Sequence, residues 1–223
     1  RQMQRDMRMK FWLATANLDR IETCLAYGIF EGVITNPHVV AQEKMPPKEL
    51  FKDICSIANA AYYQLRAGSV EEMKGEAEEM LSIDPQRMRI KVPATTQGFR
   101  VIADLTGQGI DVMATIVPTN TWMLFAVAAG AKQIAPYSGM LQKRNIIPKF
   151  DGVVQMQQII DTQGLDVEIC TGLYHPTEVA GFAEAGIKSG FIWEKDVESF
   201  LTQDLVGDAL AAFDQDWSAI DSY

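Results

Sequence analysis

Short apolar segments alternate with longer amphipathic segments about eight times along the chain from residue 10 onward. The apolar segments are rich in β-branched or aromatic residues and nearly continuous in hydrophobicity, which is typical of strands covered on both faces. We therefore predict eight strands, at residues 11–15, 32–35, 62–67, 88–93, 111–117, 133–136, 166–171 and 189–193. This alternation limits the chain to α/β architectures with parallel strands.

The segments between the strands have the periodicity of helices. In residues 47–61, for example, Leu50, Phe51, Ile54 and Ile57 recur at a spacing that places them on one helix face. We predict helices at residues 18–26, 47–61, 70–81, 98–106, 121–129, 153–162, 175–185 and 197–212, and a terminal helix around residues 214–221. Glycines stand where helices are expected to end, at positions 107, 109, 130, 164 and 186.

Two α/β architectures fit this alternation. A doubly wound sheet usually has a glycine-rich turn after its first strand, but the corresponding turn, residues 15–18, contains no glycine. The eightfold count favours the closed (β/α)8 TIM barrel, whose site lies at the C-terminal ends of the strands. We expect a single barrel domain over residues 10–223, preceded by an N-terminal extension or tag remnant at residues 1–9.

Composition excludes several classes of protein. The net charge of −9 argues against a nucleic-acid partner, which would need a basic face. No apolar run has the roughly 18 residues of a membrane helix, so no membrane partner is expected. Three separated cysteines indicate a cytoplasmic, reducing environment. His38 and His175 form too weak a ligand set for a metal site, and no cofactor is expected.

Lys91 is the most informative residue at the predicted strand ends, because it lies within the apolar strand at residues 88–93. An apolar environment disfavours the charged amine, lowers its pKa and makes it a nucleophile for carbonyl compounds. The alternative is a structural lysine that extends to solvent or pairs with a carboxylate. Most other lysines are expected in solvent-exposed helices or loops.

Four sequence segments together resemble the transaldolase family, in its small bacterial branch that includes fructose-6-phosphate aldolase. These are Ile34-Thr35-Asn36-Pro37, Ile90-Lys91-Val92-Pro93-Ala94-Thr95-Thr96-Gln97-Gly98, Ala135-Pro136-Tyr137 and Phe213-Asp214-Gln215-Asp216-Trp217. The resemblance covers nearly the whole chain after Met9. It implies that Lys91 forms a Schiff base with a ketose, and that a three-carbon dihydroxyacetone unit remains on the enzyme after cleavage.

The resemblance also implies roles for other residues. Gln64 and Tyr137 match positions where transaldolases typically carry Glu and Phe, which favours the aldolase branch. Tyr137, with a water held by Gln64 and Thr115, would then transfer protons. Thr35 and Asn36 would bind hydroxyl groups of the donor, and Ala14, Ala135 and Gly172 occupy further positions of the substrate site.

Two departures from the family pattern concern the substrate. Ala14 replaces the aspartate that normally ends the first strand, and losing such a general acid/base group typically costs about 10²–10⁴-fold in rate. Met140 and Gly172 replace the Arg and Ser of a phosphate site, although Lys143, Arg144 or Lys149 could reach it. These replacements argue against a phosphorylated substrate and favour an unphosphorylated or differently charged aldehyde.

Together these features predict a class I, Schiff-base aldolase that joins or cleaves a dihydroxyacetone-type donor and an aldehyde. One alternative is a transaldolase of the pentose phosphate pathway. Another is a weakly active sugar-binding barrel, because of Ala14. The family resemblance further implies a homo-oligomer, a pentamer or decamer, in which the terminal helix packs on a neighbouring subunit.

Overall fold

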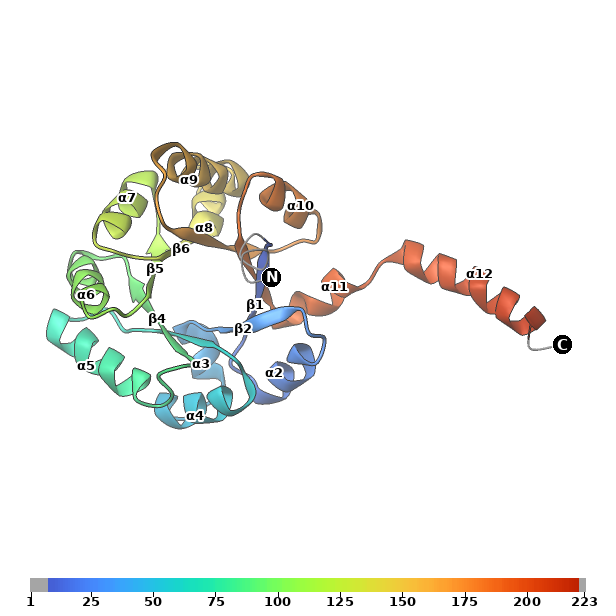
Figure 1. The fold of residues 1–223 in the computed structure, drawn as a ribbon, viewed down its shortest axis with the longest axis horizontal. Helices are drawn as coiled ribbons and strands as arrows, with labels where there is room; N and C mark the ends of the chain where they lie inside the picture. Colours follow the sequence, from blue (N-terminus) through green and yellow to red (C-terminus); the bar gives the residue numbers. More distant parts are fainter. Residues whose placement is uncertain (1–7, 221–223) are drawn as a thin grey trace.

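A closed barrel of eight parallel strands forms the centre of the molecule, and helices surround it (Figure 1). A computed structural model describes residues 8–220. The strands are β1 (Lys10–Ala14), β2 (Phe30–Ile34), β3 (Ala61–Gln64), β4 (Met88–Pro93), β5 (Val112–Val117), β6 (Gln133–Pro136), β7 (Glu168–Leu173) and β8 (Ser189–Trp193). The barrel closes where β1 pairs with β8. The predicted (β/α)8 architecture is therefore confirmed.

The helices follow the predicted order, with some differences at their ends. They are α2 (Leu18–Leu25), α3 (Pro37–Gln42), α4 (Pro47–Ile57), α5 (Val70–Leu81), α6 (Thr96–Gly107), α7 (Asn120–Ala128), α8 (Ser138–Lys143), α9 (Lys149–Gln163), α10 (Thr177–Glu184), α11 (Val197–Leu201) and α12 (Asp204–Ile220), with a 3₁₀ turn at η1 (Glu194–Asp196). The short elements α3, α8 and η1 were not predicted, because each begins almost directly after a strand.

Several helices begin after a residue whose side chain caps them. Asn17 accepts a hydrogen bond from the backbone of Arg20, and Ser69 forms a reciprocal capping box with Glu72. Gly109, Gly130, Gly164 and Gly186 have positive φ angles at or just after helix ends, as their positions in the sequence predicted. Gly107 is instead the last residue of α6.

The apolar residues form two layers. One cluster fills the barrel interior and includes Trp12, Tyr62, Met113 and Cys170. A larger cluster lies between the strands and the surrounding helices. Trp12 and Tyr62 meet edge to face, with their ring centres 4.9 Å apart.

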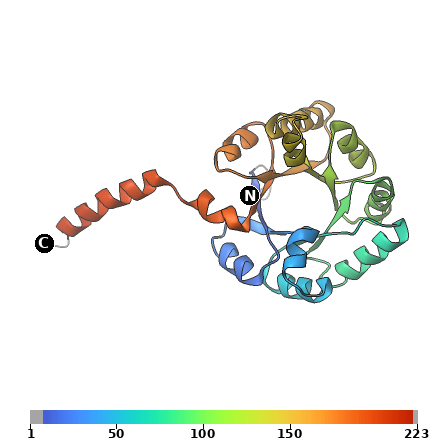
Figure 2. The ribbon, with the colours of Figure 1, turned by 180° about the vertical axis from the view of Figure 1, so that it is seen from behind.

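The C-terminal segment does not continue the barrel. The helix predicted at residues 197–212 is divided at Thr202, which is extended, into α11 and α12. Helix α12 projects away from the barrel in both views (Figures 1 and 2), and it includes most of the predicted terminal helix. All of its residues are exposed.

The N-terminal extension expected at residues 1–9 lies largely outside the described residues. Of its two described residues, Arg8 pairs with Glu31 and Met9 packs against the core. Within residues 8–220, no helix has the length and hydrophobicity needed to cross a membrane.

Candidate active site

Lys91 is buried on the interior side of β4. Only 5% of its surface is exposed. Its Nζ donates a hydrogen bond of 2.7 Å to the carbonyl oxygen of Thr35, which follows β2. No carboxylate within residues 8–220 forms an ion pair with Lys91. The sequence left open that Lys91 is a structural lysine paired with a carboxylate, and the structure does not show such a pair within the described residues.

Burial lowers the pKa of Lys91 to about 8. The neighbouring Cys170 acts in the opposite direction but more weakly. Burial raises the pKa of the Cys170 thiol to about 12, so this thiol is neutral at ordinary pH. At pH 7, a pKa near 8 leaves about 10% of the amine uncharged, against about 0.03% for an ordinary lysine. A buried and partly neutral amine is suited to attack on a carbonyl carbon.

Strand register places the predicted polar residues near Lys91. Gln64 on β3 pairs with Lys91 on β4, and Thr115 on β5 pairs with Pro93, two residues beyond Lys91. On the next strand, Ala135 pairs with Thr115. Because alternate residues of a strand point to the same side, these side chains occupy adjacent levels of the barrel interior.

A cavity of about 700 Å³ opens at the C-terminal ends of the strands. Lys91, Gln64, Thr115, Tyr137 and Ala135 line it, as does Asn36. Six of the nine predicted site residues therefore share one cavity. Its other walls come from Pro37, His38, Ile116, Pro136, Gly139, Met140, Lys143, Tyr174, Phe191, Trp193, Lys195 and Asp196.

The backbone is unusual at one point of this wall. Ile116 has a φ of +60°, a left-handed conformation that is costly for a β-branched side chain. The residue interrupts the β5–β6 register between Thr115 and Val117. As a result, Thr115 remains inside the barrel while the Ile116 side chain lies exposed at the cavity.

Thr35 and Asn36 hold the structure around Lys91. The Thr35 hydroxyl is buried and donates to the carbonyl of Tyr62 at 2.8 Å, so it is already used within the fold. The part of Thr35 that meets Lys91 is its carbonyl oxygen. Asn36 caps α3 by accepting from the backbone of His38 and Val39. Asn36 lines the cavity and Thr35 does not, and the donor-binding role expected for both residues stays a prediction.

Ala14 and Gly172 are not among the residues that line the cavity. Ala14 is buried in the interior cluster and pairs with Trp193. Gly172 lies beside the Cε1 and hydroxyl edge of the Tyr174 ring. A carboxylate near the first strand comes instead from Glu194, which accepts a hydrogen bond from Thr15.

The structure corrects one expectation about lysines. Lys149 is not solvent-exposed but buried, and its Nζ donates to Glu178 at 2.6 Å. It also lies 3.8 Å from the centre of the Tyr174 ring.

Sequence reasoning did not single out Tyr174 or Asp196, although both line the cavity. The signal that could have found them is their position, because Tyr174 lies one residue after the end of β7 and Asp196 three residues after the end of β8.

The histidines and cysteines have separate roles. His38 lines the cavity and contacts Gln42, whereas His175 accepts from the backbone of Thr177 at the start of α10. All three cysteines are free and buried. In the described part of the chain, no group of three or more His, Cys, Asp or Glu side chains could hold a metal ion.

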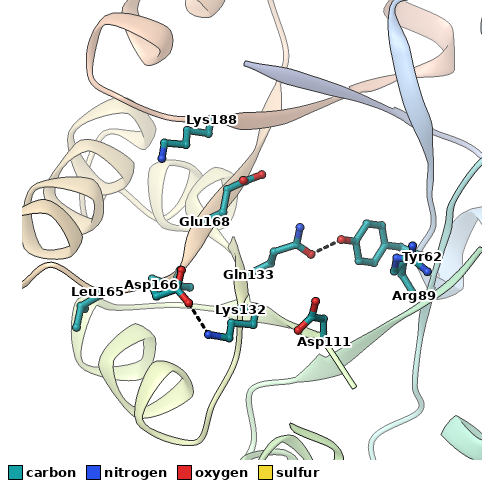
Figure 3. A pocket seen from close by; sticks show the side chains of 10 residues that line it. Tyr62, Arg89, Asp111, Lys132, Gln133, Leu165, Asp166, Glu168 and Lys188 are labelled. Atoms are coloured by element: carbon teal, nitrogen blue, oxygen red, sulfur yellow. Dashed lines mark hydrogen bonds and ion pairs between the residues drawn. The ribbon is translucent and has the colours of Figure 1, made fainter. Parts of the chain in front are cut away.

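A second cavity, of about 470 Å³, lies at the opposite end of the barrel (Figure 3). Its wall contains charges of both signs, including Arg89, Lys132 and Asp166. The hydroxyl of Tyr62 donates a hydrogen bond to the side chain of Gln133 in the same wall. The N-terminal face of such a barrel ordinarily contributes to stability rather than chemistry. It contains no equivalent of the isolated, buried Lys91.

Comparison with known proteins agrees with this geometry. Residues 11–181 match the model of the family described as transaldolase/fructose-6-phosphate aldolase. The chain belongs to the transaldolase/fructose-6-phosphate aldolase family.

Similar members of the family occur in archaea and bacteria. The chain is 29% identical to a probable transaldolase of Methanococcus maripaludis, over 95% of this chain and 98% of that protein. It is 30% identical to a probable transaldolase of Desulfotalea psychrophila, over 94% and 98%. A probable transaldolase 2 of Bacillus anthracis is also 30% identical, over 94% and 98%. Each of these matches extends over nearly the whole of both sequences.

Proposed function

We propose that this transaldolase-family protein is a class I aldolase that joins or cleaves a dihydroxyacetone-type donor and an aldehyde. The observation that supports this most directly is the buried Lys91, with its pKa lowered to about 8, in a cavity also lined by Gln64, Thr115 and Tyr137. The tyrosine and glutamine favour aldol chemistry with proton transfer to and from water.

In the direction of synthesis, the neutral amine of Lys91 adds to the ketone carbon of the donor and forms a carbinolamine. The hydroxyl of the carbinolamine then takes up a proton and leaves as water, which gives an iminium ion. The adjacent carbon then loses a proton, and the electron pair of that C–H bond forms an enamine. This carbon attacks the aldehyde carbon, and the aldehyde oxygen takes up a proton as the new C–C bond forms. Water finally adds to the imine, releasing the ketose and the free lysine. Cleavage follows the same steps in reverse.

Tyr137 is the group proposed for proton transfer. Its side chain is 45% exposed at the cavity, and its backbone N–H is fixed to the carbonyl of Val117 at 2.8 Å. A hydroxyl in this position can exchange protons through a water held by Gln64 and Thr115. Asn36 would bind a donor hydroxyl at the cavity wall.

The experiment that tests this function is borohydride reduction of the protein with dihydroxyacetone, followed by peptide mass spectrometry. We expect a reduced three-carbon adduct on Lys91 and none on the buried Lys149. Lys91→Met, analysed in parallel, should carry no adduct. Failure to trap any carbonyl donor on Lys91, from a panel of phosphorylated and unphosphorylated ketoses, would remove the basis of the proposal.

A transaldolase activity is the second candidate, because the similar proteins cited above are named probable transaldolases. The two activities differ in what releases the three-carbon unit. An aldolase releases it by hydrolysis, whereas a transaldolase needs a second aldehyde. Measuring ketose cleavage with and without an acceptor aldehyde distinguishes them, and dependence on the acceptor would favour the transferase.

A third candidate is a weakly active sugar-binding barrel, since Ala14 supplies no carboxylate. Asp196 is the one carboxylate-bearing residue within 8–220 that lines the cavity. Ala14→Asp should raise a barely measurable rate sharply if this reading is right. Efficient turnover by the unaltered protein would exclude it.

We also propose that the protein is a homo-oligomer assembled through α12. Five apolar residues recur along this helix, and all are more than half exposed: Val206, Leu210, Phe213, Trp217 and Ile220. Their spacing of three or four residues forms one continuous stripe. A second copy of the chain is the occupant proposed for it, in the pentamer or decamer that the family resemblance implies.

Light scattering of the purified protein tests this assembly. The double variant Leu210→Glu with Phe213→Glu should form particles of lower mass than the parent protein, because it places charges in the apolar stripe. Asp208→Glu, also on α12, is the matched control and should leave the mass unchanged. A parent protein that is monomeric at micromolar concentration would contradict the proposal.

A further inference from the structure

The outer wall of the Lys91 cavity is largely aromatic and apolar. The Tyr137, Tyr174 and Ile116 side chains there are 45%, 47% and 41% exposed. Phe191 and Trp193 from β8 line the same cavity and meet edge to face at 5.8 Å. Large apolar side chains gathered at a cavity indicate a ligand that covers them.

The Tyr174 ring lies against two glycines from different elements. A Cβ atom at Gly172 on β7 would lie 2.9 Å from Tyr174 Cε1 and 3.0 Å from its hydroxyl. A Cβ atom at Gly139 on α8 would lie 2.9 Å from the same hydroxyl. Real Cβ atoms do not approach so closely, so this ring position requires glycine at both places.

An ion pair between buried Lys149 and partly exposed Glu178 holds the ring from beneath. The Lys149 Nζ lies 3.8 Å from the ring centre, and only 3% of its side chain is exposed. Glu178 Oε2 accepts from Lys149 at 2.6 Å and from the Tyr174 backbone N–H at 2.8 Å. One carboxylate oxygen therefore fixes both the backbone that carries the ring and the cation under it.

This arrangement determines which charges a ligand meets. Lys149 is covered by the ring and paired with Glu178, so it is not available to a ligand. Apart from Lys91, the lysines that line the cavity within residues 8–220 are Lys143 and Lys195, and both are exposed. Exposed lysines attract anions weakly, because water and salt screen them. Met140 adds an apolar, polarisable side chain to the same wall.

We propose that the outer part of the cavity is an acceptor subsite for an uncharged aldehyde with an aromatic or bulky apolar body, and that Tyr174 determines this specificity. The inference rests on the proposed aldolase function and names the class of its second substrate. The aldehyde carbon meets the donor enamine near Lys91, while the body of the aldehyde lies against Tyr174, Phe191 and Trp193.

The first experiment compares two acceptors with dihydroxyacetone as donor, at physiological salt concentration. The uncharged aromatic acceptor is phenylacetaldehyde, and the anionic acceptor is glyceraldehyde 3-phosphate. We expect kcat/KM for phenylacetaldehyde to be at least about 10-fold higher, because apolar burial outweighs a screened charge contact. A preference for the phosphorylated acceptor would overturn the proposal.

The second experiment replaces the ring. Tyr174→Ala should lower kcat/KM for phenylacetaldehyde by about 10-fold, mainly through KM, since an aromatic contact and its buried area are lost. Tyr174→Phe should recover most of that loss. Tyr27→Ala, which removes an exposed tyrosine that does not line the cavity, is the matched control for the measurement.

Two further readouts keep the outcomes distinct. Borohydride trapping of dihydroxyacetone on Lys91 should be equal in the parent protein and the Tyr174 variants, because only the acceptor subsite is altered. Loss of trapping in the parent protein would refute the aldolase function itself, whereas normal trapping with unchanged acceptor preference in Tyr174→Ala would refute the subsite alone. If Tyr174→Ala does not fold, Tyr174→Leu keeps the bulk without the ring and decides the question in the same assay.

Discussion

Replacing Lys91 with methionine should make the protein more stable while abolishing its chemistry. The pKa of Lys91 is lowered from 10.5 to about 8 by burial, a difference that corresponds to about 3 kcal/mol against the charged folded state at pH 7. Methionine fills a similar volume without charge. It forfeits the 2.7 Å hydrogen bond to the Thr35 carbonyl, a loss of about 1 kcal/mol. The net gain in the free energy of unfolding is therefore about 2 kcal/mol.

This gain should depend on pH in a defined direction. Between pH 8 and 10.5 the unfolded chain still binds a proton on Lys91 that the folded protein has released, so the parent protein gains stability as pH rises. The advantage of Lys91→Met should thus be largest below pH 8 and disappear before pH 10.5, where the lost hydrogen bond outweighs the remaining charge penalty. Urea denaturation of both proteins at several pH values measures it, and Lys52→Met, at an exposed lysine, is the control.

Two results would refute the reasoning. One is a Lys91→Met protein that is less stable than the parent at pH 7, which would mean that the amine contributes more through its contacts than its desolvation costs. The other is a stability difference that stays constant from pH 7 to 10.5. The first result would overturn the energy balance, and the second would show that burial does not lower the pKa of Lys91, which removes the physical basis for a nucleophilic amine.

Three further predictions concern the site and the barrel around it. Trapping of dihydroxyacetone on Lys91 should accelerate about tenfold between pH 7 and 9 and then level off, because only the neutral amine attacks; a rate independent of pH would contradict this. Gly98→Ala should lower the free energy of unfolding by about 3 kcal/mol in urea, because its Cβ would lie 1.9 Å from the Pro93 carbonyl oxygen. Gly75→Ala in the middle of α5, with no atom within 4 Å, should instead raise it by about 0.5–1 kcal/mol, and equal effects would disprove the steric argument. Ile116→Gly should raise the thermal midpoint by relieving about 1 kcal/mol of backbone strain, and should raise KM for the donor as Thr115 loses its fixed position; a lower midpoint would refute the strain.

Periodicity was sufficient to predict the barrel, because strands covered on both faces and amphipathic helices leave different patterns in the sequence. Lys91 could also be found, since a charge inside an apolar strand is visible locally. Strand ends were less accurate: β7 begins at Glu168 rather than at the predicted position 166, and β3 ends at Gln64 rather than at 67. Strand ends depend on pairing with neighbours, which a single segment does not reveal.

Features set by distant contacts could not be predicted. Lys149 resembles an ordinary solvent-exposed lysine in sequence, because the carboxylate that allows its burial, Glu178, is 29 residues away. The division between α11 and α12 occurs at Thr202 without a proline or glycine to mark it. The bend at Ile116 was equally hidden, since nothing in a β-branched residue suggests a left-handed backbone.

The packing of Tyr174 makes this wall of the cavity depend on Gly139, Gly172 and Glu178. A side chain at Gly139 or Gly172 collides with the ring, and loss of Glu178 leaves Lys149 buried without its partner. A substitution at any of these three positions should therefore move the Tyr174 ring, and with it the wall of the acceptor subsite proposed above.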